Sequence, residues 1–217
     1  MKCEARIRMS EVDWSQLYKH RKNVARRFGD LWQLPIEKRY HAILMPLGKP
    51  GTALLEIGAG DRSLQARLVK QWSDFTYKSC DIDRSYPHDF FDIDDVTGLY
   101  DVICLFEIIE HLNLSQASNM VQRCQALLKP GGKIVVTTPN IYYPPGFMRD
   151  VTHCTAWCYD ELGGFFELTG LKVRTIHRLY HDSVAKRLVR RYLFYPIFRI
   201  MNFDFARQII VVAEKPE

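Results

Sequence analysis

Glycine and acidic residues stand at two places in the sequence where together they could hold a nucleoside. An apolar run at residues 54–57 contains Glu56 and breaks into Gly58 and Gly60. Glycine tolerates positive φ and has no Cβ, so a turn built on it lets backbone N–H groups approach a ligand. Asp81 follows about 20 residues later, the spacing at which a strand-tip carboxylate accepts hydrogen bonds from a ribose diol. The glycine turn alone fits simple packing equally well, whereas this spacing indicates a nucleoside-containing ligand.

Histidine and carboxylate side chains further along the chain could carry out proton chemistry. Glu110 and His111 follow an apolar run at 100–106, and His153 follows Asp150. An imidazole titrates near neutral pH and can take a proton from an acceptor hydroxyl. We expect His153 to be this base, although a hydrogen bond that only orders its loop fits the sequence as well. Glu110 and His111 are expected to be structural or to neighbour a cofactor.

The cysteines and histidines do not form a metal-binding pattern. His153, Cys154 and Cys158 lie close together, but no compact CxxC or HxxxH pair exists elsewhere to complete a structural zinc site. The six cysteines also show no short disulfide framework, which favours a reducing cytoplasm. We therefore expect free thiols and no bound metal.

Length and patterning predict one α/β domain over residues 1–217. The chain is 47% hydrophobic, enough for one sizeable core, and no apolar run is long enough to span a bilayer. The first residues do not read as a secretory signal, so a cytoplasmic protein is expected, soluble or peripheral to the inner face of a membrane. Strands alternating with helical patterns favour a mainly parallel, doubly wound sheet that binds ligands at the carboxyl ends of its strands. Strands are expected at 51–57, 75–82, 89–95, 100–106, 133–138, 171–177 and 208–213, and helices at 62–72 and 115–129.

Two segments lie outside the predicted core of residues 51–177 and 208–217. Residues 1–50 are expected to form a helical cap, with a helix at 12–34, a second helical stretch after Pro35, and basic residues mostly in water. Residues 178–207 are an insertion with seven Lys or Arg against two Asp, so this segment accounts for the whole formal charge of +5. Its basic and aromatic residues fit a helix pair packed on the domain, or a contact of residues 184–199 with anionic membrane, or a substrate lid. Nucleic acid is the least favoured partner.

Several ordered blocks resemble class I S-adenosylmethionine-dependent methyltransferases. The resemblance covers residues 54–173 and rests on LLEIGAGD, CDID, FDIDD, YDVICLFEIIEHL, LLKPGGKIVVTTPN and a final H-x5-YDEL followed by TGLKV. It implies a Rossmann-like, seven-stranded, mainly parallel sheet whose last strand is antiparallel. It also implies S-adenosylmethionine as the cofactor.

The resemblance further implies a set of cofactor-binding residues in the turns after successive strands. Asp81 matches the acid that binds the ribose hydroxyls, Ile82 the apolar residue packed on adenine, and Asp92 the acid near the adenine amino group. The sequence departs from the family's glycine motif at Arg62, a position where such motifs often have a third glycine. The full implied set is Glu56, Gly58, Ala59, Gly60, Asp81, Ile82, Asp92, Ile93, Phe106, Glu107 and His111.

The resemblance predicts an enzyme that transfers a methyl group. The expected acceptor is an oxygen of a small molecule, a sugar or a lipid-linked intermediate. The exit of the strand at 100–106 lacks the Pro-Pro-aromatic signature of enzymes that methylate amino groups of nucleic acids, so a nucleic-acid acceptor is not expected. The alternatives are an RNA-modifying methyltransferase and a non-catalytic cofactor-binding protein at a membrane surface.

Overall fold

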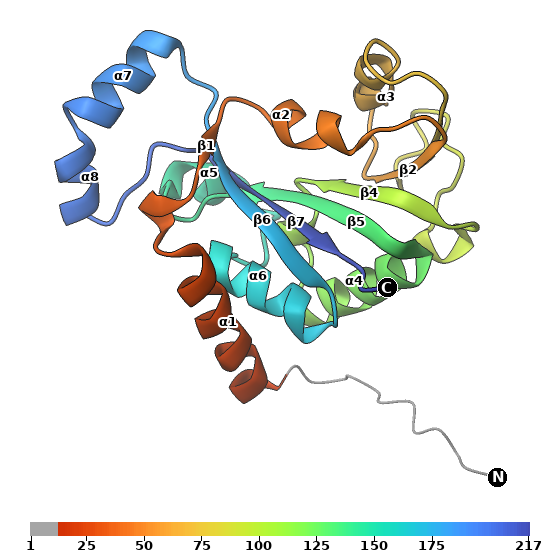
Figure 1. Ribbon diagram of the computed structural model, residues 1–217, viewed down its shortest axis with the longest axis horizontal. Helices are drawn as coiled ribbons and strands as arrows, with labels where there is room; N and C mark the ends of the chain where they lie inside the picture. Colours follow the sequence, from red (N-terminus) through yellow and green to blue (C-terminus); the bar gives the residue numbers. More distant parts are fainter. Residues whose placement is uncertain (1–12) are drawn as a thin grey trace.

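The computed structural model describes residues 13–217, whose strands form one seven-stranded sheet (Figure 1). The strand order is β1-β6-β7-β5-β4-β2-β3. β7 runs antiparallel to both of its neighbours, and the other pairs are parallel. The predicted Rossmann-like sheet with an antiparallel last strand is therefore confirmed. The strands are β1 (Ile36–Glu37), β2 (Thr52–Ile57), β3 (Phe75–Cys80), β4 (Tyr100–Phe106), β5 (Leu128–Pro139), β6 (Lys172–Leu179) and β7 (Gln208–Glu214).

Helices cover both faces of this sheet (Figure 1). Alternate residues of a strand point to opposite faces, so Leu55 and Ile57 of β2 join the core cluster under α1, α4 and α6, whereas Leu54 joins the cluster under α2 and α3. Both faces are thus buried, as the continuous apolar strands predict. The helices are α1 (Trp14–Phe28), α2 (His41–Leu44), α3 (Ser63–Leu68), α4 (Leu114–Leu127), α5 (Pro144–Met148), α6 (Tyr159–Leu168), α7 (Val184–Tyr192) and α8 (Tyr195–Ile200), with 3₁₀ turns η1 (Leu31–Gln33), η2 (Met45–Leu47), η3 (Ile93–Asp95) and η4 (Ile109–His111).

At the sheet edges one predicted strand is wrong and one predicted helix begins later than expected. At 89–95 only Phe90 pairs with the sheet, through one bridge to Cys80, and η3 follows. The Asp92 carboxylate accepts a hydrogen bond from the Asp94 N–H at 2.9 Å, and such local bonding of aspartate competes with a strand. The seventh strand is instead β1, whose backbone extends the free edge of β6. The helical stretch expected after Pro35 therefore begins only at His41, as α2.

The cap helix α1 packs tightly on α6. A Cβ on Gly164 of α6 would lie 2.6 Å from the backbone nitrogen of Arg21, so only glycine permits this approach. Arg21 pairs with Asp160 at 2.8 Å and Arg27 with Glu167 at 2.6 Å. Both arginines thus form ion pairs with α6 while Arg27 stays exposed, so these pairs bind the cap to the domain without contradicting the expectation that most of its basic residues lie in water. Residues 1–12 of the predicted cap lie outside the described part of the chain.

The insertion forms a helical hairpin at the end of the molecule where the parallel strands finish (Figure 1). No residue of α7 or α8 is buried. The insertion is shorter than predicted, because β6 continues to Leu179, and its base is anchored by a buried ion pair between Arg178 and Asp204 at 3.0 Å. Asn140 after β5 donates to the same Asp204 carboxylate at 2.9 Å. Among the described residues no helix is both long and apolar enough to cross a membrane.

Candidate active site

Two features of the turn after β2 favour glycine. Gly58 has a φ of +73°, which L side chains rarely adopt. A Cβ at this position would also lie 2.2 Å from Cδ1 of Ile108, which follows β4. The Gly58 N–H donates to the Cys80 carbonyl at 2.9 Å, which ties the turn to the end of β3.

Arg62 stands where motifs of the resembled family often have a third glycine, and it takes a glycine-like conformation. Its φ is +58°, and it begins α3. Its guanidinium donates to the Pro87 carbonyl at 3.0 Å and lies 5.4 Å from the centre of the Tyr77 ring. The side chain is thus engaged with the neighbouring loop, which explains how the turn tolerates an arginine here.

Asp81 links the ends of β2 and β3. Its Oδ2 accepts from the Gly60 N–H at 2.7 Å, and its Oδ1 accepts from the Asp83 N–H at 2.9 Å. The adjacent Ile82 leaves 88% of its surface exposed, so its apolar side chain is free to pack on a ligand. A charged acceptor and an uncovered apolar side chain therefore stand together at the carboxyl end of β3.

A cavity of about 550 Å³ opens at this edge of the sheet, and we call it the first cavity. Seven residues of the implied cofactor-binding set line it: Gly58, Asp81, Ile82, Asp92, Ile93, Glu107 and His111. Five further residues complete its wall and were not predicted to bind the cofactor: Ile57, Cys80, Ile108, Leu112 and Met120. Most of the five are apolar, so in the sequence they are indistinguishable from core residues; Met120, for example, fits the inner face of the helix at 115–129.

The other four implied residues lie outside this wall. Glu56 is buried and accepts a hydrogen bond from the Tyr77 hydroxyl. Burial raises the Glu56 pKa to about 7, against the opposing effect of that hydrogen bond. Phe106 packs on Tyr40, with ring centres 4.6 Å apart. Ala59 is buried, and Gly60 contributes its N–H to Asp81.

A second cavity, of about 470 Å³, adjoins the first and shares Glu107 and His111 with it. It is lined mainly by charged and polar residues that follow β4 and β5: Glu107, Glu110, His111, Pro139, Tyr143, Pro145, Gly146, Arg149, Asp150, His153 and Arg207. The predicted base His153 therefore lies in the same cavity as Glu110 and His111, which follow β4.

Glu107 stands between the two cavities in a strained conformation. Its φ is +56°, a left-handed value that costs a non-glycine residue about 1 kcal/mol. Its backbone N–H donates to Thr137 of β5, and its Oε1 has no hydrogen-bond partner among the described residues. Burial raises the pKa of its carboxyl. Strain and an unpaired buried oxygen in one residue are typical of functional sites.

His153 and His111 lie side by side, with ring centres 4.8 Å apart. The Nδ1 of His153 lies 2.7 Å from the Phe147 carbonyl, which can only accept, so Nδ1 carries the proton. Thr152 Oγ1 lies 2.6 Å from the Asp150 carboxylate and 2.9 Å from Nδ1 of His111. Because the hydroxyl gives its single proton to the carboxylate, it accepts from His111. In the neutral form, both imidazoles therefore keep an Nε2 lone pair.

Glu110 is completely buried at the floor of the second cavity. Neither of its carboxylate oxygens has a hydrogen-bond partner among the described residues. Burial, followed by the nearby Glu107 carboxyl, raises the Glu110 pKa to about 8. Its backbone carbonyl accepts from the N–H groups of Cys154 and Thr155 at 2.8 and 3.0 Å, which holds the His153 loop against the end of β4.

Comparisons with known proteins identify the family. A family model described as "Methyltransferase domain" matches residues 27–176, so the chain belongs to this family of methyltransferase domains. A search of curated proteins found no match. The class I S-adenosylmethionine-dependent methyltransferase assignment made from the sequence motifs is thereby confirmed.

Solved structures share this fold at low sequence identity. An S-adenosylmethionine-dependent methyltransferase from Archaeoglobus fulgidus has a TM-score of 0.63 and 16% identity, over 94% of this chain and all of that one. The N-methyltransferase NodS from Bradyrhizobium japonicum WM9, with S-adenosyl-L-homocysteine, has a TM-score of 0.55 and 15% identity over 91% and 99%. An O-methyltransferase family protein from Burkholderia thailandensis has a TM-score of 0.53 and 14% identity over 82% and 56%. Because one of these neighbours is named an N-methyltransferase and another an O-methyltransferase family protein, the shared fold does not determine whether nitrogen or oxygen is methylated.

The first cavity fits the cofactor that the family implies. Its volume lies within the range of about 300–1,000 Å³ typical of small-molecule sites. Apolar walls from Ile82, Ile93 and Met120 suit a nucleobase, and the Asp81 carboxylate stands where a diol can donate to it. The glycine turn leaves room that a Cβ at Gly58 would remove. The residues present are therefore suited to S-adenosylmethionine.

Proposed function

We propose that this protein transfers a methyl group from S-adenosylmethionine in the first cavity to a hydroxyl oxygen of an acceptor in the second. The observation that carries the proposal is the contact between the two cavities, which share Glu107 and His111. Methyl transfer is an in-line displacement, so an enzyme accelerates it chiefly by holding donor and acceptor close and aligned. Two adjoining cavities of different chemistry provide such an arrangement.

The residues of the first cavity hold the cofactor. Asp81 accepts from the ribose hydroxyls, Ile82 and Ile93 pack on the adenine, and Asp92 accepts from its amino group. The bound cofactor supplies an activated methyl group on a sulfonium. Gly58 keeps the backbone clear of the cofactor, and Glu107, which lines both cavities and whose Oε1 has no hydrogen-bond partner among the described residues, would hold the positively charged sulfonium.

His153 is the proposed base. Its Nδ1 proton is directed to the Phe147 carbonyl, so its Nε2 lone pair is the one available to take the acceptor's proton. The ring contacts Phe147, with centres 5.0 Å apart, and its side chain is only 7% exposed. Such packing fixes the direction of the Nε2 lone pair. This supports the role of His153 as a base over a role in which it only orders its loop.

The charges of the second cavity suggest the class of acceptor. Arg149, which follows α5, and Arg207, which precedes β7, both line this cavity. One guanidinium group can donate to two phosphate oxygens at once. The cavity is also large enough for a monosaccharide unit. We therefore favour a phosphate-bearing small molecule, such as a nucleotide-linked or lipid-linked sugar.

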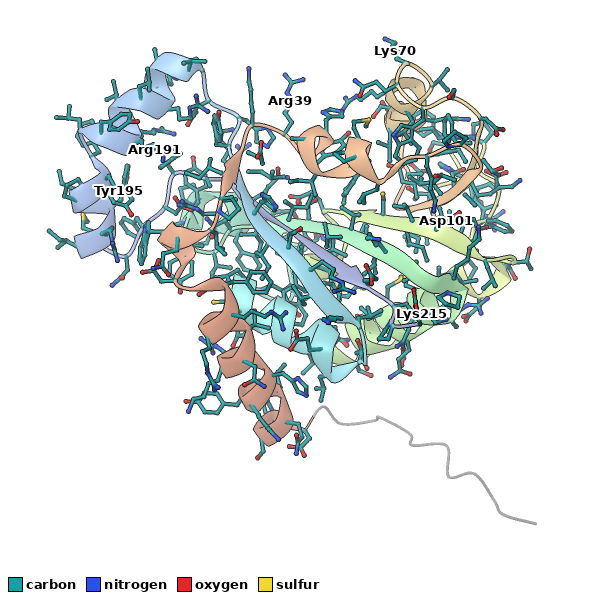
Figure 2. All side chains as sticks on the ribbon, viewed as in Figure 1. Arg39, Lys70, Asp101, Arg191, Tyr195 and Lys215 are labelled. Carbon is teal, nitrogen blue, oxygen red and sulfur yellow. The ribbon has the colours of Figure 1, made fainter. Side chains whose placement is uncertain are left out.

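The hairpin of α7 and α8 supports a peripheral contact with an anionic membrane. It exposes apolar side chains next to its cations: Val184, Leu188, Val189, Tyr192, Leu193, Phe194, Ile197 and Ile200 are all at least 41% exposed. Arg187 and Arg190 bind Tyr180 and Asp182, whereas Lys186 and Arg191 form no ion pair in the described part of the chain. Figure 2 shows Arg191 and Tyr195 at the opposite end of the molecule from Asp101 and Lys215.

The decisive experiment combines cofactor binding with a search for the acceptor. Purified protein is titrated with S-adenosyl-L-homocysteine by calorimetry, then incubated with S-adenosylmethionine and panels of nucleotide-linked sugars, lipid-linked sugars and RNA. Mass spectrometry should detect a gain of one methyl group in a phosphate-bearing acceptor. Methylated RNA would favour an RNA-modifying enzyme, and tight binding without turnover on any panel would favour a non-catalytic protein.

A further inference from the structure

Three side chains around the second cavity have the chemistry of a metal site. Glu110, His111 and His153 each offer one ligand atom, and these atoms all lie within 4.8 Å of one another. Two imidazoles and one carboxylate are ligands that first-row divalent ions prefer. Ligands around an ion at about 2.1 Å lie roughly 3–4 Å apart, so small side-chain rotations would close the set.

Two further observations separate this cluster from a chance gathering of polar groups. First, Glu110 is completely buried, and neither oxygen of its carboxylate has a hydrogen-bond partner among the described residues, a costly state for a native side chain. Second, both imidazoles are oriented through Nδ1: that of His153 by the Phe147 carbonyl, that of His111 by Thr152. Metal-binding histidines are held in this manner, with the second nitrogen donating to a fixed acceptor.

We infer that Glu110, His111 and His153 bind one divalent first-row metal ion at the junction of the two cavities. This departs from the expectation of no metal, which considered only compact Cys and His pairs in the sequence. Three protein ligands leave coordination positions open toward the cavity. A hydroxyl bound at one of them would become more acidic and would release its proton to water in the open cavity. With its Nε2 lone pair on the ion, His153 would hold the ion in place and would not take the proton itself.

The ion's role in activating an acceptor rests on the methyl transfer proposed above, but the binding site itself does not. The test is therefore made without cofactor. Chelator-treated protein is titrated with Zn²⁺ in competition with a chromophoric chelator, and with Co²⁺ while its visible absorption is recorded. We expect one ion per chain with micromolar or tighter affinity. Mg²⁺, which prefers oxygen ligands, should bind more weakly.

Single variants test each ligand. Glu110→Gln, His111→Ala and His153→Ala should each weaken Zn²⁺ binding by at least about tenfold and change the Co²⁺ spectrum. His181→Ala is the matched control, because His181 binds Gln208 outside the cluster. Thermal melting of each variant confirms that it is folded. The inference is overturned if wild-type protein binds no stoichiometric ion, or if any of the three variants binds as the wild type does.

A separate titration keeps the two proposals apart. Chelator-treated protein should still bind S-adenosyl-L-homocysteine, because the cluster touches the first cavity only through His111. Metal binding without cofactor binding would remove the proposed methyl transfer and leave the ion site standing. Cofactor binding without metal binding would remove the ion site and leave the proposed methyl transfer standing.

Discussion

The Gly60 N–H donates a 2.7 Å hydrogen bond to Oδ2 of Asp81. This bond joins the glycine turn after β2 to the tip of β3, so the two motifs that first indicated a nucleoside ligand are in direct contact. The other oxygen, Oδ1, is held by the Asp83 N–H at 2.9 Å. Two backbone donors therefore fix the carboxylate at the rim of the first cavity before any ligand arrives.

Replacing this carboxylate should weaken cofactor binding. Asp81→Ala removes the proposed acceptor of the ribose hydroxyls and a charged acceptor of two backbone N–H groups. We expect a loss of about tenfold to a hundredfold in affinity for S-adenosyl-L-homocysteine by calorimetry. Asp94→Ala is the control, because Asp94 lies near the cavity but its side chain is 86% exposed. Equal affinity of Asp81→Ala and wild type would remove Asp81 from the site.

Gly58→Ala should cost both stability and cofactor affinity. The substitution forces alanine into a positive φ and places its Cβ against Ile108. Gly98→Ala shares the positive φ but meets no atom within 4 Å, so it measures the backbone cost alone, about 1 kcal/mol. Chemical denaturation should show a larger loss for Gly58→Ala. In the double variant with Ile108→Ala, the total loss should be smaller than the sum of the two single losses. Additive losses would mean that the contact with Ile108 does not matter.

The sequence predicted those parts of the fold that depend on local patterns. The apolar run of β2, the glycine turn and Asp81 at the end of β3 all lie where spacing and residue type indicated. Each needs only its own neighbours, because strand burial, a positive φ and a strand-tip carboxylate are decided locally. The helix expected at 115–129 forms as α4, one residue earlier, with Asn113 and Gln116 as a capping box.

Other features depend on distant contacts, and the sequence did not reveal them. β1 exists because residues 36 and 37 pair with the free edge of β6, a partner that no local pattern identifies. Glu110 meets His153 because its backbone carbonyl holds the loop at Cys154 and Thr155. The buried pair of Arg178 and Asp204 spans the insertion. In each case one partner alone looks like an ordinary surface or core residue.

Glu56 should make the protein less stable as the pH rises from about 5 to about 7. Its folded pKa of about 7 lies above the unfolded value of 4.5, so in this window the folded protein holds a proton that the unfolded chain has lost. The free energy of unfolding should fall by about 3 kcal/mol from this group, and no further above pH 7. Denaturation at several pH values should show a smaller fall in Glu56→Gln. The surface variant Asp94→Asn should follow the wild type, and an identical slope for Glu56→Gln would contradict the assignment.

His153→Ala should lower turnover without changing cofactor affinity, because His153 lines only the second cavity. Loss of a positioned proton acceptor typically costs about a hundredfold to ten-thousandfold in rate. The measurement is the rate of methyl transfer to the acceptor found by mass spectrometry, alongside calorimetry with S-adenosyl-L-homocysteine. The control His181→Ala should keep the wild-type rate. A wild-type rate in His153→Ala would end its proposed part in the reaction.

Anionic vesicles should bind the protein through the α7–α8 hairpin. Lys186 and Arg191 form no ion pair in the described part of the chain, and each cation near an anionic surface contributes about 1 kcal/mol. Neutralising both, as Lys186→Gln with Arg191→Gln, should therefore weaken sedimentation with phosphatidylserine vesicles by roughly thirtyfold. Higher salt should weaken the wild type as well, since the attraction is screened.

A matched pair of substitutions separates this contact from a general effect of net charge. Lys70, which is exposed, and Lys215 lie away from the hairpin (Figure 2). Neutralising them to glutamine removes the same charge, yet it should leave vesicle binding nearly unchanged, because screening limits their reach to about 10 Å at moderate salt. Equal losses in the two double variants would show that net charge alone attracts the protein. Equal sedimentation with neutral phosphatidylcholine vesicles would show that the exposed apolar residues of the hairpin act without its cations.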